Sequence, residues 1–246
     1  MTGARWVLGI DTAGRVGSIA LAASGSAVGW ETIAPGEHSS SISCAGSRLL
    51  EGEDLGWRDL AAIAVSSGPG SFTGLRIGLA WAKGVCFGSR AKLVLVPAHE
   101  ANAYRHRRDR DFIATVLQGE RGEAQAALWS GGETMTRLWG PESVPERELA
   151  EKLRSAAGSH VPETGRGRAG AAAIAGAVAG PDMKPGLAAS LKDAGIELLD
   201  AGAPPPTAAA VAELGDRKLL QREEEEDLAR AAPAYGRAPN ARKPSP

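Results

Sequence analysis

Several features that are common in secreted, membrane and metal-binding proteins are scarce in this sequence of 246 residues. Its two cysteines, Cys44 and Cys86, lie far apart and lack a CxxC spacing, which argues against a disulfide framework and favours a reducing compartment. There is no run of about 20 apolar residues, and the N-terminus lacks the apolar stretch of a signal peptide. We therefore expect a soluble, cytoplasmic protein without a membrane segment.

Aromatic residues and net charge are also scarce. Aromatics make up 4% of the chain although hydrophobic residues make up 43%, so alanine and glycine must build a core in which backbones approach closely. The formal net charge of -1 provides no overall field for attracting nucleic acid or an anionic membrane. Any contact with RNA must be local or supplied by a partner.

The motifs of common enzyme classes are missing as well. The glycine-rich segment at 68–78 matches neither the GxxxxGK[ST] nor the GxGxxG nucleotide loop, and no GxSxG elbow supports a peptidase. Paired metal ligands such as HxxxH are not formed by the four histidines, His38, His99, His106 and His160. These absences predict no metal, no catalytic residue and no cofactor of the chain's own.

What the sequence does contain is a repeated order of elements. Apolar runs and turn residues in the first half predict three antiparallel strands and then alternating helices and strands. The predicted strands are 5–10, 16–22, 27–34, 61–66 and 93–96, and the predicted helices are 38–50, 71–87 and one from about residue 99. The order is β-β-β-α-β-α-β-α.

The second half follows the same order. We predict strands at 112–117, 123–129, 133–139, 171–179 and 196–199, and helices at 145–156, 184–194 and 207–220. This repeat predicts an α/β protein with the duplicated two-lobed fold of the actin, Hsp70 and sugar-kinase (ASKHA) class. The predicted domains are a first lobe at 1–104, a second lobe at 105–220 and a partly extended C-terminal segment at 221–246.

Asp11 ends the first strand and enters a glycine-containing turn. In actin-like proteins such a carboxylate approaches metal-bound phosphate, so Asp11 and Thr12 are candidates for an inherited phosphate or nucleotide site. The alternative is an Asp that only caps its own turn. Gln118 is the matching residue of the second half, and a neutral amide there argues against a complete kinase or ATPase site.

A glycine-rich segment at 68–78 (GPGSFTGLRIG) precedes the second helix. Ser71 or Thr73 is suited to cap that helix, and free amides there suit an anion. Taken alone the segment favours a rigid elbow between strand and helix, because such elbows are frequent in α/β proteins. Gly74, Gly78 and Ala82 form a smooth helix face. Because each helical glycine costs about 1 kcal/mol relative to alanine, this face predicts close packing, either within the lobe or between subunits.

Two charged segments leave alternatives open. The basic cluster at 104–110 suits tRNA phosphates, but acidic Asp109 and Asp111 dilute its charge and favour a solvated linker. Residues 223–227 are acidic and favour a solvated helix face, and the tail from Pro233 onward is predicted to be extended.

Four segments together resemble the TsaB (YeaZ) family: 8–13 (LGIDTA), Glu37-His38 before a helix, 68–78 and 233–237 (PAYGR). The glycine-rich segment is highly specific for this family, and the first hundred residues resemble it throughout. The second half resembles it more weakly. The family usually has Asp near Gln118, an aromatic residue near Gln125 and leucine at Gly236.

The resemblance implies an actin-like fold and a non-catalytic, activating role beside a TsaD-like transferase that forms N6-threonylcarbamoyladenosine at position 37 of tRNA. It further implies a TsaE-like ATPase partner, ATP used by the complex, tRNA reached through the complex, and pairing, also with a second copy, through the first-lobe helices. The subunit contact would then involve Gly74, Gly78, Ala82, Ile42 and Leu49. Alternative functions are an actin-fold phosphotransferase or ATPase that uses Asp11 and, with less support, a peptidase.

Overall fold

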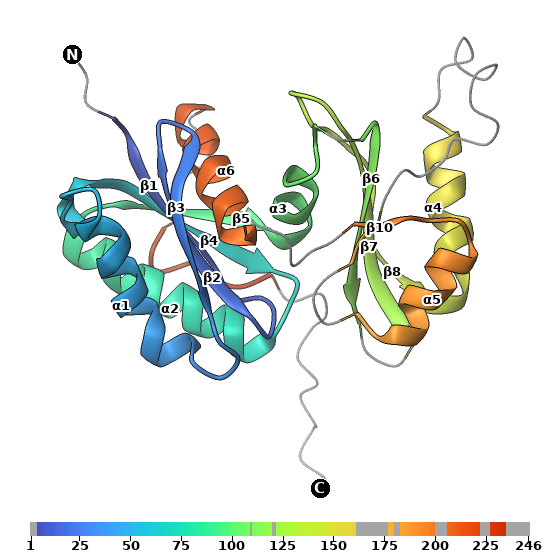
Figure 1. The fold of residues 1–246 in the computed structure, drawn as a ribbon, viewed down its shortest axis with the longest axis horizontal. Helices are drawn as coiled ribbons and strands as arrows, with labels where there is room; N and C mark the ends of the chain where they lie inside the picture. Colours follow the sequence, from blue (N-terminus) through green and yellow to red (C-terminus); the bar gives the residue numbers. More distant parts are fainter. Residues whose placement is uncertain are drawn as a thin grey trace, which may run out of the picture.

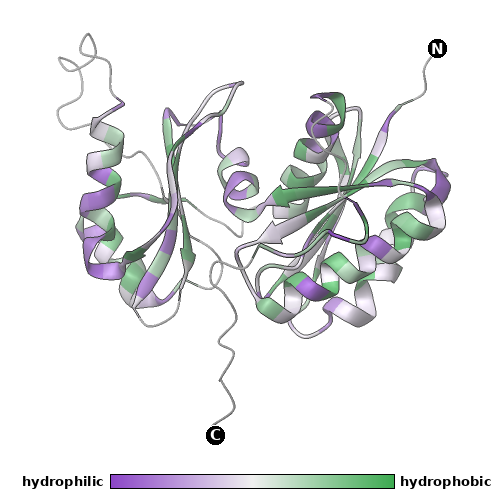
Figure 2. Cartoon of the chain, turned by 180° about the vertical axis from the view of Figure 1, so that it is seen from behind, coloured by the Kyte–Doolittle hydropathy of each residue, from purple (hydrophilic) through white to green (hydrophobic). Residues whose placement is uncertain are grey.

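The computed structural model describes residues 4–108, 110–119, 122–160, 177–179, 183–199, 206–221 and 227–234. These residues form two five-stranded sheets, each covered by helices, so that the chain has two lobes side by side (Figure 1). Hydrophobic residues concentrate along the strands and on the helix faces turned toward them (Figure 2).

The first sheet has the order β3-β2-β1-β4-β5. Its strands are β1 (Trp6–Asp11), β2 (Gly17–Ala23), β3 (Ser26–Ile33), β4 (Leu60–Gly68) and β5 (Lys92–Pro97). Short turns make β1, β2 and β3 antiparallel neighbours, whereas β4 and β5 run parallel to β1 after helical crossovers. The central strands are buried on both faces, which explains their almost continuous apolar sequence.

The second sheet repeats this arrangement with the order β10-β9-β6-β7-β8. Its strands are β6 (Phe112–Gln118), β7 (Glu123–Ser130), β8 (Arg137–Pro145), β9 (Ala177–Ala179) and β10 (Leu198–Leu199). The central strands of the two sheets, β1 and β6, end at Asp11 and Gln118. The predicted duplication and the predicted match of these two positions are therefore confirmed for the backbone.

Helices cover both faces of the first sheet and the outer face of the second (Figure 1). Helices α1 (His38–Glu51) and α2 (Phe72–Ser89) lie on one side of the first sheet. Helix α6 (Thr207–Gln221) lies on its other side, while α3 (Ala98–Tyr104) lies between the lobes. In the second lobe α4 (Leu149–Gly158) and α5 (Pro185–Asp193) enclose the core beside β6 and β7. Short 3-10 turns precede β4 (Trp57–Asp59) and α4 (Glu146–Glu148).

The assignment of residues 207–220 to the second lobe was wrong. Helix α6 returns to the first lobe, where its alanine-rich face packs on β1, β2 and β4. A Cβ added at Gly9 would overlap the backbone of α6 at Ala208, so glycine on the strand and alanine on the helix permit the close approach. Arg5 and the buried Asp216 add an ion pair between the strand and the helix.

Two further boundaries differ from the predictions. β8 begins at Arg137 and continues to Pro145, so the loop after β7 is longer and α4 begins later than expected. Residues 227–234 also pack on the first lobe, with Ala231 buried in its core, so this part of the C-terminal segment is not a free tail. The predicted strand 171–179 lies outside the described residues except for β9. None of the described helices is long and apolar enough to cross a membrane.

Candidate functional site

The candidate site begins at the turn that follows β1. Asp11 is half-buried there, and its Oδ1 accepts a hydrogen bond from the Ala13 amide at 3.0 Å. Burial raises the pKa of the Asp11 carboxyl, while the Ala13 amide, the Ser66 hydroxyl and the charges of Arg105 and His38 act in the opposite direction. Asp11 therefore caps its own turn, as one of the two interpretations of the sequence expected.

Thr12 joins this turn to the glycine-rich segment. Its side chain is fully buried, and Oγ1 donates a hydrogen bond of 2.8 Å to the carbonyl oxygen of Gly74. A Cβ at Gly74 would overlap the Thr12 carbonyl oxygen, and one at Gly78 would overlap Thr12 Oγ1. Gly74 and Gly78, two of the four glycines of α2, are thus required by a backbone turn inside the same lobe.

The N-terminus of α2 is occupied by contacts from the same lobe. The Ser71 amide donates to the Ala13 carbonyl at 2.7 Å, and Ser71 Oγ caps the helix by accepting from the Gly74 amide at 3.2 Å. A Cβ at Gly70 would come within 2.6 Å of the Ala13 oxygen. Two amides at this helix N-terminus, those of Ser71 and Gly74, are therefore already bonded within the lobe, and the geometry supports the interpretation as a rigid elbow.

The C-terminal segment contacts the beginning of the glycine-rich elbow, at the end of β4. Gly68 has a φ of +104°, which favours glycine, and the Ala234 amide donates to the Ser67 carbonyl at 2.7 Å. A Cβ at Gly68 would lie 2.6 Å from the Ala234 oxygen. The two family motifs at 68–78 and 233–237 therefore contact each other, through Gly68 of the first and Ala234 of the second.

Sequence reasoning missed two neighbours of Asp11. Ser66 is 1% exposed near the end of β4, and His38 is 9% exposed at the start of α1. The imidazole of His38 lies over Gly17, where an added Cβ would come within 2.9 Å of Nε2. Spacing along the chain could not reveal this group, because three separate elements contribute to it.

Three of the four predicted phosphate-site residues, Asp11, Thr12 and Ser71, lie together, while Thr73 is exposed on the first turn of α2. The opposing loop of the second lobe at 120–121 and the side chain of Gln118 lie outside the described residues. Within the described ranges, no three His, Cys, Asp or Glu side chains gather as a metal cluster. Phosphate binding by this group stays a prediction, although the internal hydrogen bonds argue against it.

The predicted subunit contact was largely wrong. Gly74, Gly78, Ala82 and Ile42 are buried inside the first lobe and cannot touch a partner. The side chain of Leu49 faces β3, where a Cβ at Gly29 would come within 3.2 Å of it. The smooth face of α2 serves packing within the lobe, which was the other alternative that the sequence left open.

The basic cluster at 104–110 is largely paired with acidic residues. Arg107 lies 3.8 Å from Glu213, Arg108 lies 3.4 Å from Glu133, and Arg110 lies 2.9 Å from Glu197. These pairs lower the positive charge available for phosphates. The geometry therefore supports a structural linker rather than an RNA site.

Comparison with solved structures identifies the fold class of this chain. A YeaZ structure from Pseudomonas aeruginosa aligns over 94% of this chain and 99% of its own with a TM-score of 0.69 and 18% identity. A second P. aeruginosa structure, described as having similarity to peptidase YEAZ, covers 95% and 100% with a TM-score of 0.71 and 20% identity. Component A of the (R)-2-hydroxyglutaryl-CoA dehydratase of Acidaminococcus fermentans covers 88% and 99%, with a TM-score of 0.50 and 12% identity. The chain has the actin-like two-lobed fold.

Sequence comparison identifies the family. Residues 32–241 match the model described as "TsaD: tRNA N6-adenosine threonylcarbamoyltransferase". The tRNA threonylcarbamoyladenosine biosynthesis protein TsaB of Escherichia coli K12 is 30% identical over 57% of this chain, and that of Bacillus subtilis 168 is 30% identical over 50%. These matches span 65% and 54% of the relatives' own lengths. The chain belongs to the TsaD family and, within it, to the TsaB (YeaZ) group.

Proposed function

We propose that this chain is a non-catalytic partner subunit of the assembly that forms N6-threonylcarbamoyladenosine at position 37 of tRNA. It would pair with a TsaD-like transferase, while a TsaE-like ATPase would use the ATP of the complex and tRNA would be bound through the complex. Membership of the TsaD family and relatives named for threonylcarbamoyladenosine biosynthesis support this proposal. No cofactor of its own is needed for such a role.

The observation that carries the non-catalytic role is the internal use of the α2 N-terminus. Ser71 and Gly74 donate their amides within the lobe, and Thr12 is fully buried under α2. A phosphotransferase of this fold needs the turn after β1 to bind phosphate, and it needs hydrogen-bond donors placed around the transferred group. The hydroxyl of Ser66, which lies beside Asp11, is buried and out of reach of a peptide, so this packing does not favour a peptidase.

The surface best suited to a protein partner lies on the outer side of α1 and α2. Phe87 near the end of α2 is 86% exposed, and Phe72 at its start is 46% exposed. A groove of about 640 Å³ is lined by Trp57, Trp81 and, among other residues, Gly88, which follows Phe87 in the sequence. The two indole rings meet edge to face at 5.6 Å. Exposed aromatic side chains next to a groove are typical of binding surfaces. We assign the TsaD-like partner, or a second copy of the chain, to this face.

Reconstitution tests the proposed function. Purified TsaD-like and TsaE-like proteins, ATP, the threonylcarbamoyl donor and unmodified tRNA should form the modified nucleoside at a clearly higher rate when this chain is added. The chain alone should neither modify tRNA nor hydrolyse ATP, and Asp11→Asn should retain the stimulation. An ATPase activity of the purified chain that Asp11→Asn abolishes would instead establish the phosphotransferase alternative.

The Phe87→Glu variant tests the assigned surface. A charge in place of an exposed aromatic side chain that the partner would cover should weaken binding to the TsaD-like partner about tenfold or more, as measured by calorimetry. Leu220→Glu is a matched control because Leu220 is 62% exposed on α6, which lies on the other side of the sheet. Equal binding by Phe87→Glu and the wild type would place the contact elsewhere, without contradicting the role as a subunit.

A further inference from the structure

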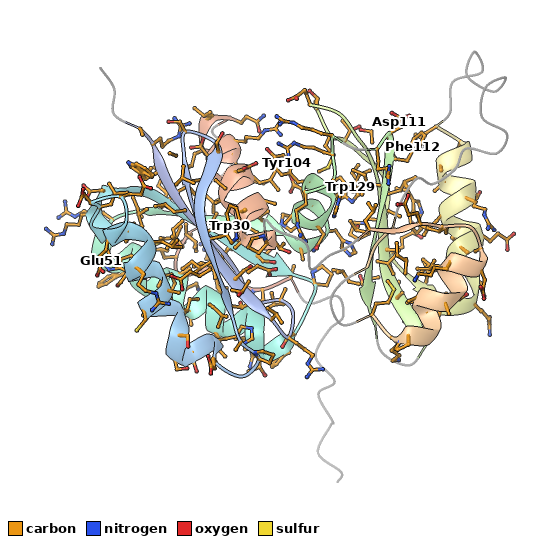
Figure 3. All side chains as sticks on the ribbon, viewed as in Figure 1. Trp30, Glu51, Tyr104, Asp111, Phe112 and Trp129 are labelled. Carbon is orange, nitrogen blue, oxygen red and sulfur yellow. The ribbon has the colours of Figure 1, made fainter. Side chains whose placement is uncertain are left out.

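Helix α3 contributes to the cores of both lobes. Ala101 and Tyr104 belong to a cluster with first-lobe strands and α6, whereas Ala103 belongs to a cluster with β6 and β7. Tyr104 and Trp129 both lie in the region between the two sheets (Figure 3). A helix of seven residues that is buried on two sides joins the lobes through apolar contact, in addition to the chain connections.

A buried polar chain crosses the same boundary. His99 of α3 is 2% exposed, and its Nδ1 lies 2.8 Å from Oγ1 of the fully buried Thr115 of β6. The indole Nε1 of Trp129 donates to the same hydroxyl at 3.3 Å. Trp129 and Thr115 are on neighbouring strands of the second sheet, so of these two contacts only that of His99 joins α3 to that lobe. Separating the lobes here would leave the buried imidazole without the Thr115 hydroxyl in a poorly solvated place, which is costly.

Ion pairs fix α3 and the connecting segment on each side. Glu100 of α3 lies 3.5 Å from Lys218 of α6, and the guanidinium of Arg107 lies 3.5 Å above the ring of Tyr104. On the other side Arg110 lies 2.9 Å from Glu197 in the second lobe. Rotation about the connection would have to disturb contacts in both directions.

We propose that α3, through the contact of its His99 with Thr115, holds the two lobes in one fixed arrangement, so that they do not hinge against one another. Two-domain proteins commonly enclose a ligand by hinge closure. In this chain buried side chains of α3 belong to the apolar clusters of both lobes, and the partner would meet a preformed two-lobed surface. This inference goes beyond the proposed function, because it concerns the chain by itself.

Spin labels on the full-length chain can test it. Glu51 and Lys152 are exposed on α1 and α4, in different lobes, so cysteines there report the interlobe distance by double electron–electron resonance. Cys44, which is exposed, is replaced by serine, and Cys86 is buried and retained. The parent protein and Thr115→Ser, which keeps the hydroxyl, should give one narrow distance peak. Thr115→Val keeps the volume but loses the bond and should shift part of the population to a second distance.

Two results would overturn the proposal. One is a broad or double distribution in the parent protein, and the other is a folded Thr115→Val protein whose single peak equals that of Thr115→Ser. Circular dichroism establishes folding, and His99→Leu serves as a second variant if Thr115→Val does not fold. The parent distribution decides the matter even if neither variant folds.

Discussion

The Gly74→Ala variant is expected to lower the free energy of unfolding by about 3 kcal/mol, near the upper end of the cost of overpacking a core. The added Cβ would overlap the backbone carbonyl of Thr12, which cannot rotate away as a flexible side chain can. Relief requires α2 to move outward, which would also lengthen the hydrogen bond from Thr12 Oγ1 to the Gly74 oxygen, now 2.8 Å. Urea unfolding followed by circular dichroism measures the loss.

Gly84→Ala on the same helix is the matched control. Gly84 is exposed, and a Cβ there would meet no atom within 4 Å. Because alanine favours a helix over glycine, this variant should gain up to about 1 kcal/mol of stability. Equal effects of the two substitutions would show that helix propensity, rather than the close approach of Thr12, explains the glycine at position 74.

His99 should make the protein less stable as the pH falls from 7 to 5. Burial lowers the pKa of its imidazole from 6.5 to about 4, so the folded protein keeps it neutral where the unfolded chain binds a proton. The unfolded state then binds more protons, and stability decreases with falling pH between about pH 6.5 and 4. For this one group the expected loss between pH 7 and pH 5 is about 2 kcal/mol.

The measurement is the difference in unfolding free energy between wild type and His99→Asn at each pH. Asparagine places an amide near the position of Nδ1 and does not titrate, so carboxylates common to both proteins cancel. The wild type should lose about 2 kcal/mol relative to this variant between pH 7 and pH 5. His160→Gln, which removes an exposed histidine at the end of α4, should behave like the wild type. Parallel pH profiles of wild type and His99→Asn would contradict the burial argument.

The strands and helices of the first lobe were largely predictable because each is local. Apolar runs bounded by Gly, Pro, Ser and Asp place β1, β4 and β5, and the N-cap Ser71 was among the candidates for starting α2. β8 was misplaced because the turn residues at 130–132 open a longer loop instead of a tight hairpin. The weak period of the alanine-rich second half gave less information about boundaries.

The partners of small residues were not predictable. The small residues Gly74, Gly78 and Ala82 predict that something packs closely against α2. The sequence does not show whether that neighbour is a turn, another helix or another protein. The structure places Thr12 there, 62 residues away from Gly74 along the chain. The same applies to α6, whose alanines fit either lobe and which returns to the first.

By itself the sequence determined the duplicated order of strands and helices, the matching ends of β1 and β6, and the family, because apolar period, turn chemistry and a specific motif are all local patterns. Tertiary structure alone decided that α6 belongs to the first lobe, that Gly74 and Gly78 of α2 pack against the turn after β1, and that His99 reaches Thr115 across the lobes. Those outcomes depend on which buried surfaces fit one another at short range. The spacing of residues along the chain does not determine the shape of such a packed interface.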